Sequence, residues 1–165
     1  MGEASLARRV FLGLGSNLGE RSQNLCGALE LLALTEGVYE IKCSKWHETA
    51  PVGGPSDQGH YLNGACDLMT TLSPEELLAR CQEIELLFGR VRLEENGPRT
   101  LDIDLLCYEG EERESAALQL PHPKLEERAF VLAPLAELAP DFVLKRSGET
   151  VAARAAALTF TEALS

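Results

Sequence analysis

Residues 61–89, YLNGACDLMTTLSPEELLARCQEIELLFG, place a strand and a helix next to each other in the chain. Residues 61–71 are typical of a β-strand. Ser73 as N-cap, Pro74 in the first turn and Glu76 three residues after the cap form a strong helix start. Apolar residues then follow the helical period over residues 74–88, up to Gly89, which ends the helix: Leu77, Cys81, Ile84 and Phe88.

The segment before this stretch predicts a strand, a helix and a second strand. Residues 10–14, VFLGL, are apolar and run into a turn, as expected of a strand. Apolar side chains at helical spacing predict a helix over 21–34, and alternation over 38–46 predicts a strand. Residues 49–60, TAPVGGPSDQGH, predict a long loop, a kind of segment that is often functional.

The segment after it begins with a polar loop that contains three arginines, residues 90–99, and continues into a strand over 100–108. Beyond this strand we expect shorter elements: an acidic hairpin or loop over 109–117, a short strand over 118–120, a helix starting near Lys124, an apolar segment over 130–139 interrupted by Pro134, a short strand near 142–144 and a helix from about 149 to 157.

The order β-α-β-β-α-β over the first 108 residues is that of a ferredoxin-like α+β sandwich. We therefore expect an antiparallel sheet with two helices on one face and appended C-terminal elements. The chain has 165 residues and no linker that would divide it, so we expect a single domain over residues 1–165.

Composition narrows the classes of partner. Hydrophobic residues make up 45% of the chain and charged residues 25%, as in ordinary globular proteins. The formal charge of −11 disfavours long nucleic acids and anionic membranes as partners. No apolar run is long enough to span a bilayer, and Met1–Arg9 lacks the apolar core of a signal peptide. The five cysteines fall in apolar stretches without metal-ligand spacing, so we expect small buried hydrophobes in a cytoplasmic protein.

Asp102 and Asp104 are the most informative pair for chemistry. Side chains two apart on a strand share a face, so the two carboxylates point the same way, flanked by apolar residues. Such a pair suits Mg²⁺, which takes one or two carboxylates together with substrate phosphates. Two ordinary aspartates on a solvent-facing edge are the alternative.

Four arginines shift that balance towards phosphate chemistry: Arg90, Arg92, Arg99 and Arg128. Guanidinium groups bind phosphate oxygens bidentately, and phosphoryl transfer depends on positioning and charge neutralisation. Surface pairing of these arginines with neighbouring glutamates is the alternative. The chain contains neither G-x-x-x-x-G-K-[ST] nor G-x-G-x-x-G, so a nucleotide would bind outside the P-loop and kinase patterns.

A histidine and a small group of polar and aromatic residues complete the set of candidates. His122 lies between two prolines that stiffen the backbone, which suits an imidazole that contacts a phosphate. Tyr61 and Asn63 share a strand face, and with Thr49 and Phe130 they could line a small-molecule pocket. Taken singly, each of these residues has an ordinary structural explanation in the core or in a turn.

Seven segments together resemble the 6-hydroxymethyl-7,8-dihydropterin pyrophosphokinase family over nearly the whole chain. They are GLGSNLGER (13–21), ETAPVGG (48–54), YLNGAC (61–66), SPEELL (73–78), IELLFGRVR (84–92), GPRTLDIDLL (97–106) and LPHPKLEERAFVLAPLAELAP (120–140). The resemblance implies a ferredoxin-like fold and an ATP-dependent pyrophosphokinase of folate biosynthesis, which transfers pyrophosphate from ATP to the pterin's hydroxymethyl group and releases AMP. It implies two Mg²⁺ ions, and we expect a monomer.

The resemblance also implies a role for each matching residue. Asp102 and Asp104 correspond to the magnesium ligands, and Arg90 and Arg92 to arginines of a mobile loop that closes over ATP. The remaining correspondences fall into three groups: Arg99, Arg128 and His122 at the triphosphate; Gln82 and Glu85 at the ATP site, with Leu105 or Leu106 beside the adenine; and Tyr61, Phe130, Asn63, Thr49, Pro51 and Val52 around the pterin.

One region departs from the family. A basic residue and a tryptophan usually precede the G-P-R segment, whereas this chain has Glu95 and Asn96 in a loop one residue shorter. We expect the change to affect loop closure and turnover more than specificity. Two other functions remain as alternatives: a non-catalytic pterin- or nucleotide-binding module of the same fold, and a two-metal phosphohydrolase.

Overall fold

The computed structural model describes residues 6–49, 60–89 and 101–164. Its main sheet contains β1 (Arg8–Ser16), β2 (Val38–Cys43), β4 (Tyr61–Thr70) and β5 (Asp102–Tyr108) in the order β2-β4-β1-β5. A fifth strand, β3 (His47–Thr49), also pairs with β4. Every one of these pairings is antiparallel.

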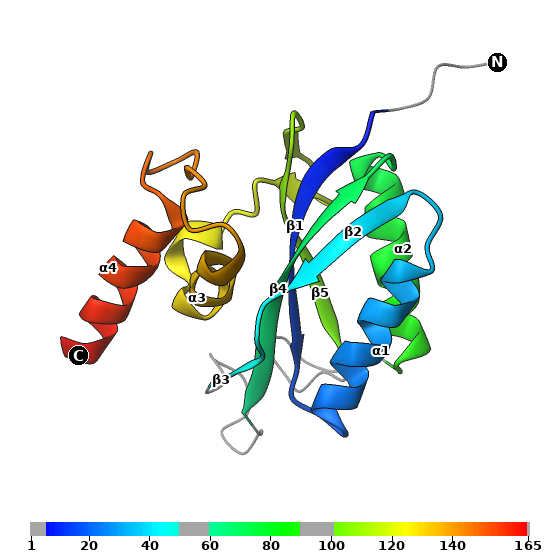
Figure 1. Cartoon of the computed structure of the whole chain (residues 1–165), viewed down its shortest axis with the longest axis horizontal. Coiled ribbons are helices and arrows are strands. Elements are labelled where there is room, and N and C mark those ends of the chain that lie inside the picture. Colours follow the sequence, from blue (N-terminus) through cyan, green and yellow to red (C-terminus); the bar gives the residue numbers. More distant parts are fainter. Residues whose placement is uncertain (1–5, 50–59, 90–100, 165) are drawn as a thin grey trace.

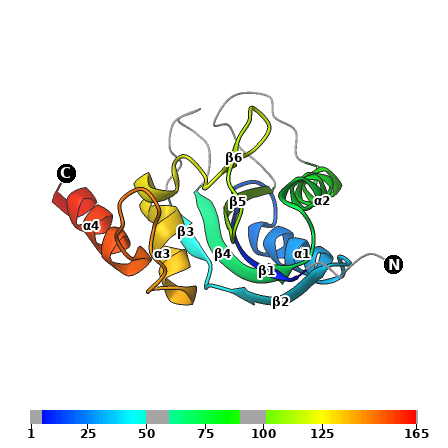
Figure 2. The ribbon, with the colours of Figure 1, turned by 90° about the horizontal axis from the view of Figure 1, so that it is seen from above.

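Helices cover both faces of this sheet. Figure 1 shows α1 (Arg21–Ala33) and α2 (Pro74–Leu87) on one face and α3 (Ala129–Leu138) on the other. The last helix, α4 (Val151–Leu164), packs on α3 on the side away from the sheet, as the view from above also shows (Figure 2). The expected mixed architecture, an antiparallel sheet with helices, is confirmed.

Alternation along β1 divides the interior into two cores. Val10, Leu12 and Leu14 point towards α1 and α2, whereas Phe11 belongs to the core beneath α3 and α4. The positions on the α3 face that follow Phe11 are Gly13 and Gly15, which carry no side chain. The sheet surface under the start of α3 is therefore hollow at this end, and the site described below lies there.

The start of α2 forms as its sequence predicts. The Ser73 hydroxyl accepts a hydrogen bond from Glu76 N, and the Glu76 carboxylate accepts one from Ser73 N, which completes a capping box. Pro74 occupies the first turn, where its missing N–H has no helical partner to lose. This anchors the helix that packs beside β5.

The predicted strand over 38–46 is right as far as Cys43 and wrong over 44–46. The chain leaves the edge of the sheet after Cys43 and returns as β3. Trp46, between the two strands, packs against Gly64, where an added Cβ would lie 2.4 Å from the indole ring. The glycine therefore allows the tryptophan to cross β4 closely, and the second short strand places Thr49 beside Tyr61.

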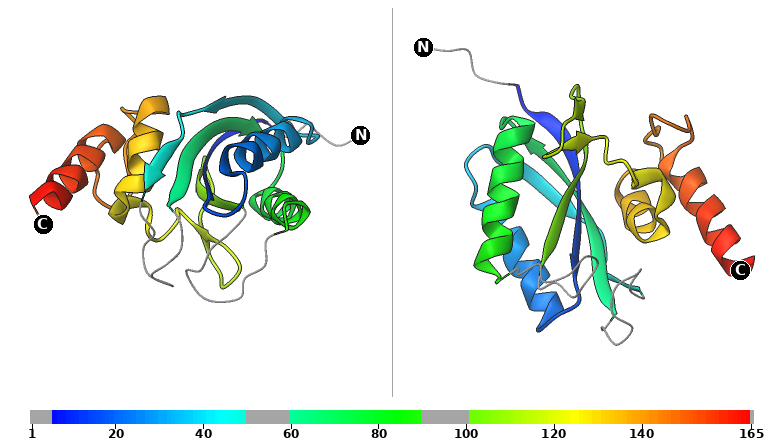
Figure 3. Two further views of the ribbon diagram at one scale, coloured as in Figure 1. Left: turned by 90° about the horizontal axis from the view of Figure 1, so that it is seen from below. Right: turned by 180° about the vertical axis from the view of Figure 1, so that it is seen from behind.

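The C-terminal segments are more divided than predicted. A small hairpin of β6 (Arg113–Glu114) and β7 (Gln119–Leu120) stands in the acidic segment, and a 3-10 turn, Leu125–Glu127, precedes α3. The expected strand near 142–144 is a single bridge between Val143 and Thr150. Figure 3 shows α4 on the far side of α3 from the sheet. Within the described ranges, no helix has the length and apolarity needed to cross a membrane.

Candidate active site

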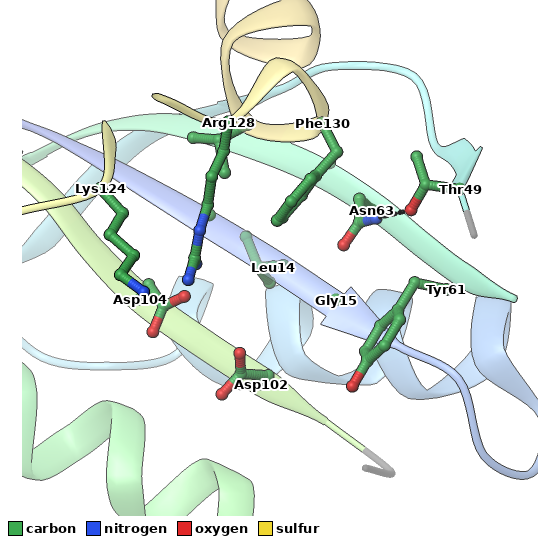
Figure 4. Close-up of a pocket in the computed structure, with 13 residues that line it drawn as sticks. Leu14, Gly15, Thr49, Tyr61, Asn63, Asp102, Asp104, Lys124, Arg128 and Phe130 are labelled. Carbon is green, nitrogen blue, oxygen red and sulfur yellow. Dashed lines mark hydrogen bonds between the residues drawn. The ribbon is translucent and has the colours of Figure 1, made fainter. Parts of the chain in front are cut away.

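A cavity of about 190 Å³ lies between the sheet and the segment that enters α3. Strands β1, β3, β4 and β5 form its floor and one wall, and residues 124–131 form the opposite wall. Figure 4 shows two different ends: charged side chains gather at one end, and two aromatic rings with an amide gather at the other. The labelled residues of the charged end are Asp102, Asp104, Lys124 and Arg128, and those of the other end are Thr49, Tyr61, Asn63 and Phe130.

The charged end is built on β5. Asp102 and Asp104 share the face that looks towards α3, while Ile103 between them is buried against the other helix pair. Their register partners on β1 are Gly15 and Gly13. Because both partners lack side chains, the space in front of the two carboxylates stays open to a ligand.

Two cations face these carboxylates from the opposite wall. Arg128 is the N-cap residue of α3, and Lys124 precedes the 3-10 turn; both side chains line the cavity. The guanidinium carbon of Arg128 also lies 5.5 Å from the centre of the Phe130 ring. This end of the cavity therefore offers both anionic and cationic groups, the combination that metal-bound phosphates require.

The other end is held by a polar contact between two strands. Asn63 is 9% exposed, and its Nδ2 donates a hydrogen bond to the Thr49 hydroxyl of β3. Its Oδ1 lies over Gly15, where an added Cβ would approach that oxygen to 2.7 Å. The glycine thus leaves room for the amide, whose orientation is fixed by Thr49. A fixed amide edge suits recognition of a heterocycle.

Tyr61 and Phe130 bring aromatic rings to the same end from opposite walls. Tyr61 comes from β4, two positions before Asn63 and on the same face, and Phe130 comes from the first turn of α3. A flat ligand lying between them would contact both rings. The structure brings Thr49, Tyr61, Asn63 and Phe130 together in the lining of one cavity.

His122 lies close to the charged end without lining the cavity. Its Nδ1 accepts a hydrogen bond from Lys124 N at 3.1 Å, which leaves the proton of a neutral ring on Nε2. Burial lowers the pKa of His122; the charges of Arg128 and Lys124 lower it further, and Asp102 opposes them. The imidazole is therefore neutral at pH 7 and carries an Nε2–H donor.

Four candidates on α2 and β5 do not line this cavity. Gln82 is exposed on α2, and Glu85 is buried, with its carboxylate accepting a hydrogen bond from Ile103 N at 2.8 Å. Glu85 thereby positions the strand that carries Asp102 and Asp104. Leu105 and Leu106 are both buried, on opposite sides of the sheet, as expected for neighbouring residues of a strand.

Other candidates fall outside the described residues. These are Arg90, Arg92, Arg99, Pro51 and Val52, together with the Glu95-Asn96 departure.

Sequence reasoning missed six residues that line the cavity, among them Lys124, Gly13 and Gly15; the other three are Leu14, Gly64 and Val131. Lys124 stands two residues after His122, and its charge there was the available signal; it was interpreted only as the start of a helix. The glycines were interpreted as a strand and turn, although alternate glycines on a strand indicate a close approach of another group.

Comparisons with known proteins agree with one another. The sequence model described as 7,8-dihydro-6-hydroxymethylpterin-pyrophosphokinase matches residues 11–140. A protein of Synechocystis sp. named 2-amino-4-hydroxy-6-hydroxymethyldihydropteridine pyrophosphokinase is 49% identical over 142 residues, which cover 86% of this chain and 72% of that protein. A protein of Methylorubrum extorquens with the same name is 48% identical over 143 residues, covering 87% and 89% of the two chains.

A solved structure supports the fold. Wild-type HPPK-DHPS of Plasmodium falciparum, solved with pterin and p-hydroxybenzoate, superposes with a TM-score of 0.74 at 13% identity. The match covers 99% of this chain and 45% of that one, so this chain spans less than half of that protein. At this level of identity the likeness concerns the fold alone.

Proposed function

The chain belongs to the 7,8-dihydro-6-hydroxymethylpterin-pyrophosphokinase family, and from that membership we infer that it is an ATP-dependent pyrophosphokinase of folate biosynthesis. It transfers pyrophosphate from ATP to the hydroxymethyl group of 6-hydroxymethyl-7,8-dihydropterin and releases AMP. One observation carries the assignment of this reaction to the cavity: its charged end and its aromatic-amide end face the same space. A phosphate donor and a flat heterocycle can therefore meet there.

The pterin is proposed to bind at the aromatic-amide end. Tyr61 and Phe130 would contact the two faces of the ring, and the Asn63 amide would hydrogen-bond its edge. Thr49 supports this role because its hydroxyl accepts from Asn63 Nδ2, which leaves Oδ1 as the acceptor for a ring N–H. The hydroxymethyl group would then point towards the carboxylates. Pro51 and Val52 remain proposals for the same pocket.

The triphosphate is proposed to bind at the charged end. Arg128 and Lys124 would contact phosphate oxygens, and the neutral His122 would donate from Nε2–H. Arg90, Arg92 and Arg99 are proposed to add charge from the segment between α2 and β5, with Arg90 and Arg92 closing over the nucleotide. Gln82 is proposed to border the ATP site. Glu85 acts at a distance, through the start of β5.

Asp102 and Asp104 fit a magnesium site. They supply hard oxygen ligands on one face of β5, and their register partners on β1 are both glycines. Among the described residues, no group of three or more histidine, cysteine or acidic side chains is placed so that it could hold a metal ion by itself. We propose that the two aspartates hold two Mg²⁺ ions. When bound, the ions neutralise phosphate charge and acidify a coordinated hydroxyl.

In this proposal the described residues of the cavity mainly bind the two substrates and orient them for the reaction. The pterin hydroxyl is proposed to attack the β-phosphorus of ATP in line, so that the new P–O bond forms as the bond to AMP breaks. Tyr61, Phe130 and Asn63 fix the attacking group, and Lys124 and Arg128 restrain the phosphates.

The strand order β2-β4-β1-β5 supports a ferredoxin-like core. We further propose a single domain over residues 1–165 that acts as a monomer.

The KM values for the pterin and for ATP, measured in variants of each end, test the proposal that the pterin binds at one end of the cavity and the triphosphate at the other. Asn63→Ala should raise the KM for the pterin by about tenfold or more and leave the KM for ATP nearly unchanged, because it removes a hydrogen bond at the amide end. Arg128→Met should do the reverse, since it removes a charge-assisted contact to phosphate. Lys42→Met, on exposed β2, serves as the control for loss of a surface charge. Equal effects of both site variants on both constants would contradict the assignment.

A further inference from the structure

Cys43 and Cys66 face each other across two neighbouring strands. They are register partners in β2 and β4, and their sulfur atoms lie 3.1 Å apart. The next pair along, Ser44 and Ala65, is joined by a hydrogen bond from Ser44 N to Ala65 O. Because bonded and non-bonded pairs alternate in an antiparallel ladder, Cys43 and Cys66 occupy a non-bonded pair, where side chains lie closest.

The geometry of this pair is close to that of a disulfide. An S–S bond is about 2.05 Å long, so the sulfurs need to approach by only about 1 Å. Directly opposed residues of a non-bonded antiparallel pair have Cα atoms about 4.5 Å apart, within the range that a disulfide spans.

The two thiols differ in environment. Cys43 lies on β2, at the edge of the sheet, and is exposed, whereas Cys66 is completely buried in the core beneath α1 and α2. The expectation that all five cysteines are buried is therefore wrong for Cys43, and also for Cys26. A hydrogen bond from Cys66 lowers the pKa of Cys43, while the same contact and burial raise the pKa of Cys66. An oxidant from solvent would meet Cys43 as the more reactive thiol.

We propose that Cys43 and Cys66 form a modification site, at which hydrogen peroxide oxidises the two thiols to an intramolecular cross-strand disulfide. The Cys43 thiolate attacks a peroxide oxygen, the O–O bond breaks, and Cys43 becomes a sulfenic acid as one water is released. Cys66 then attacks that sulfur, the S–S bond forms, the S–O bond breaks, and a second water leaves. The thiols lose two electrons and two protons, and hydrogen peroxide is reduced to two waters.

The disulfide strengthens the sheet without obstructing the cavity. Neither sulfur lines the site, although Cys66 stands three positions after Asn63 on β4. The bond ties the edge strand to a central strand and closes a loop between positions 23 apart, which restricts the unfolded chain. Oxidation at this site therefore stabilises the fold and leaves turnover intact.

Treatment of the purified full chain with hydrogen peroxide tests the proposal. Tryptic cleavage after Lys42 and Lys45 releases Cys43 in a tripeptide, so a disulfide appears under non-reducing conditions as that tripeptide joined to the peptide that contains Cys66. We expect this species, three remaining free thiols, and a melting midpoint raised by roughly 5 °C or more. Dithiothreitol should reverse all three changes, and activity should stay within about twofold.

Two variants separate this site from the other thiols. Cys43→Ser, at an exposed edge position, should fold normally and show neither the joined peptide nor the rise in midpoint. Cys26→Ser, which removes the other exposed thiol, should behave as the wild type. A sulfinic acid or an intermolecular bond at Cys43 with Cys66 still reduced would overturn the proposal. So would a joined peptide accompanied by a lower midpoint or by loss of activity.

Discussion

Individual residues divide the cavity into its two ends. Asp102 and Asp104 lie on the same face as Asn63 and Tyr61, with a strand of alternating glycines between them. Removing one side chain from such an arrangement should weaken ligand binding at one end of the cavity more than at the other. Two further residues bear on these ends: Gly15, which gives room to Asn63, and His122, the proposed phosphate donor whose protonation depends on its surroundings.

Gly15→Ala should weaken pterin binding. The new Cβ would lie 2.7 Å from Asn63 Oδ1, so the amide must move and its contact with Thr49 is lost. The backbone of Gly15 lies outside the left-handed region, so alanine brings no backbone strain. We expect an increase of about tenfold in the KM for the pterin, measured by steady-state kinetics.

A double mutant identifies the cause of this effect. In an Asn63→Ala background the amide is absent, so Gly15→Ala should add little to the loss already present. If the losses in pterin binding were fully additive, the effect of Gly15→Ala would not depend on the Asn63 amide.

The protonation of His122 should appear in the pH dependence of stability. Its pKa is lowered in the folded state by burial and by Arg128 and Lys124, so the unfolded chain binds the proton more readily. The free energy of unfolding therefore falls as the pH drops from about 6.5 towards the lower pKa of the folded protein. His122→Gln should reduce this dependence, measured by urea unfolding between pH 7 and pH 5. An equal slope in both proteins would show that His122 does not contribute.

At the scale of secondary structure, the site depends on how α2 and β5 are held together. The buried Glu85 carboxylate of α2 binds Ile103 N, the residue between the two aspartates. The capping box at Ser73 fixes the other end of the same helix. Because the cap lies at the end of α2 away from Glu85, a change there should alter the stability of the helix without touching the cavity.

Ser73→Ala should destabilise the protein by about 1 kcal/mol, because the Glu76 N–H loses its acceptor. The melting midpoint should fall by about 2–4 °C for a chain of this size. Catalytic constants should not change. Ser73→Asp keeps a capping acceptor and serves as the control; a loss as large as that of Ser73→Ala would argue against the cap as the cause.

The elements that the sequence predicted well are those with a strong local signal. The helix over 74–88 has both a capping box and a full apolar stripe, and the structure places α2 at Pro74–Leu87. The prediction of a strand over 38–46 is right as far as Cys43 and wrong for the three residues that follow, because the chain leaves the sheet there and two consecutive polar residues, Ser44 and Lys45, interrupt the alternation. Trp46 then packs against Gly64 of β4, a tertiary contact that local spacing does not encode.

For the cavity too, the sequence predicts the residues that follow from local periodicity and misses those that depend on tertiary contacts. Asp102 and Asp104 follow from strand periodicity, and Tyr61 with Asn63 from the same rule. Lys124 could not be placed, because its position depends on how the segment before α3 folds back over β5. Local spacing also could not show that Glu85 is turned inward to a backbone N–H instead of towards a ligand.

At the scale of the whole molecule, the two faces of the sheet differ: one packs a closed core, and the other also forms the cavity. The face covered by α1 and α2 is a closed apolar core, whereas the face under α3 is packed at one end and hollow at the other. The core beneath α3 and α4 holds the segment that carries Lys124, Arg128 and Phe130 against the strands that carry Asp102 and Asn63. The appended C-terminal elements therefore complete the site that the sheet begins.

The most direct test of this account is the formation of AMP from Mg-ATP, with and without 6-hydroxymethyl-7,8-dihydropterin, by the wild type and by Asp104→Ala. The wild type should form AMP only when the pterin is present, with one pterin diphosphate for each AMP. Asp104→Ala should retain its circular dichroism spectrum and lose turnover, since it removes one of the two carboxylates of the metal site. Release of AMP or phosphate without the pterin, or a folded and active Asp104→Ala protein, would contradict the account.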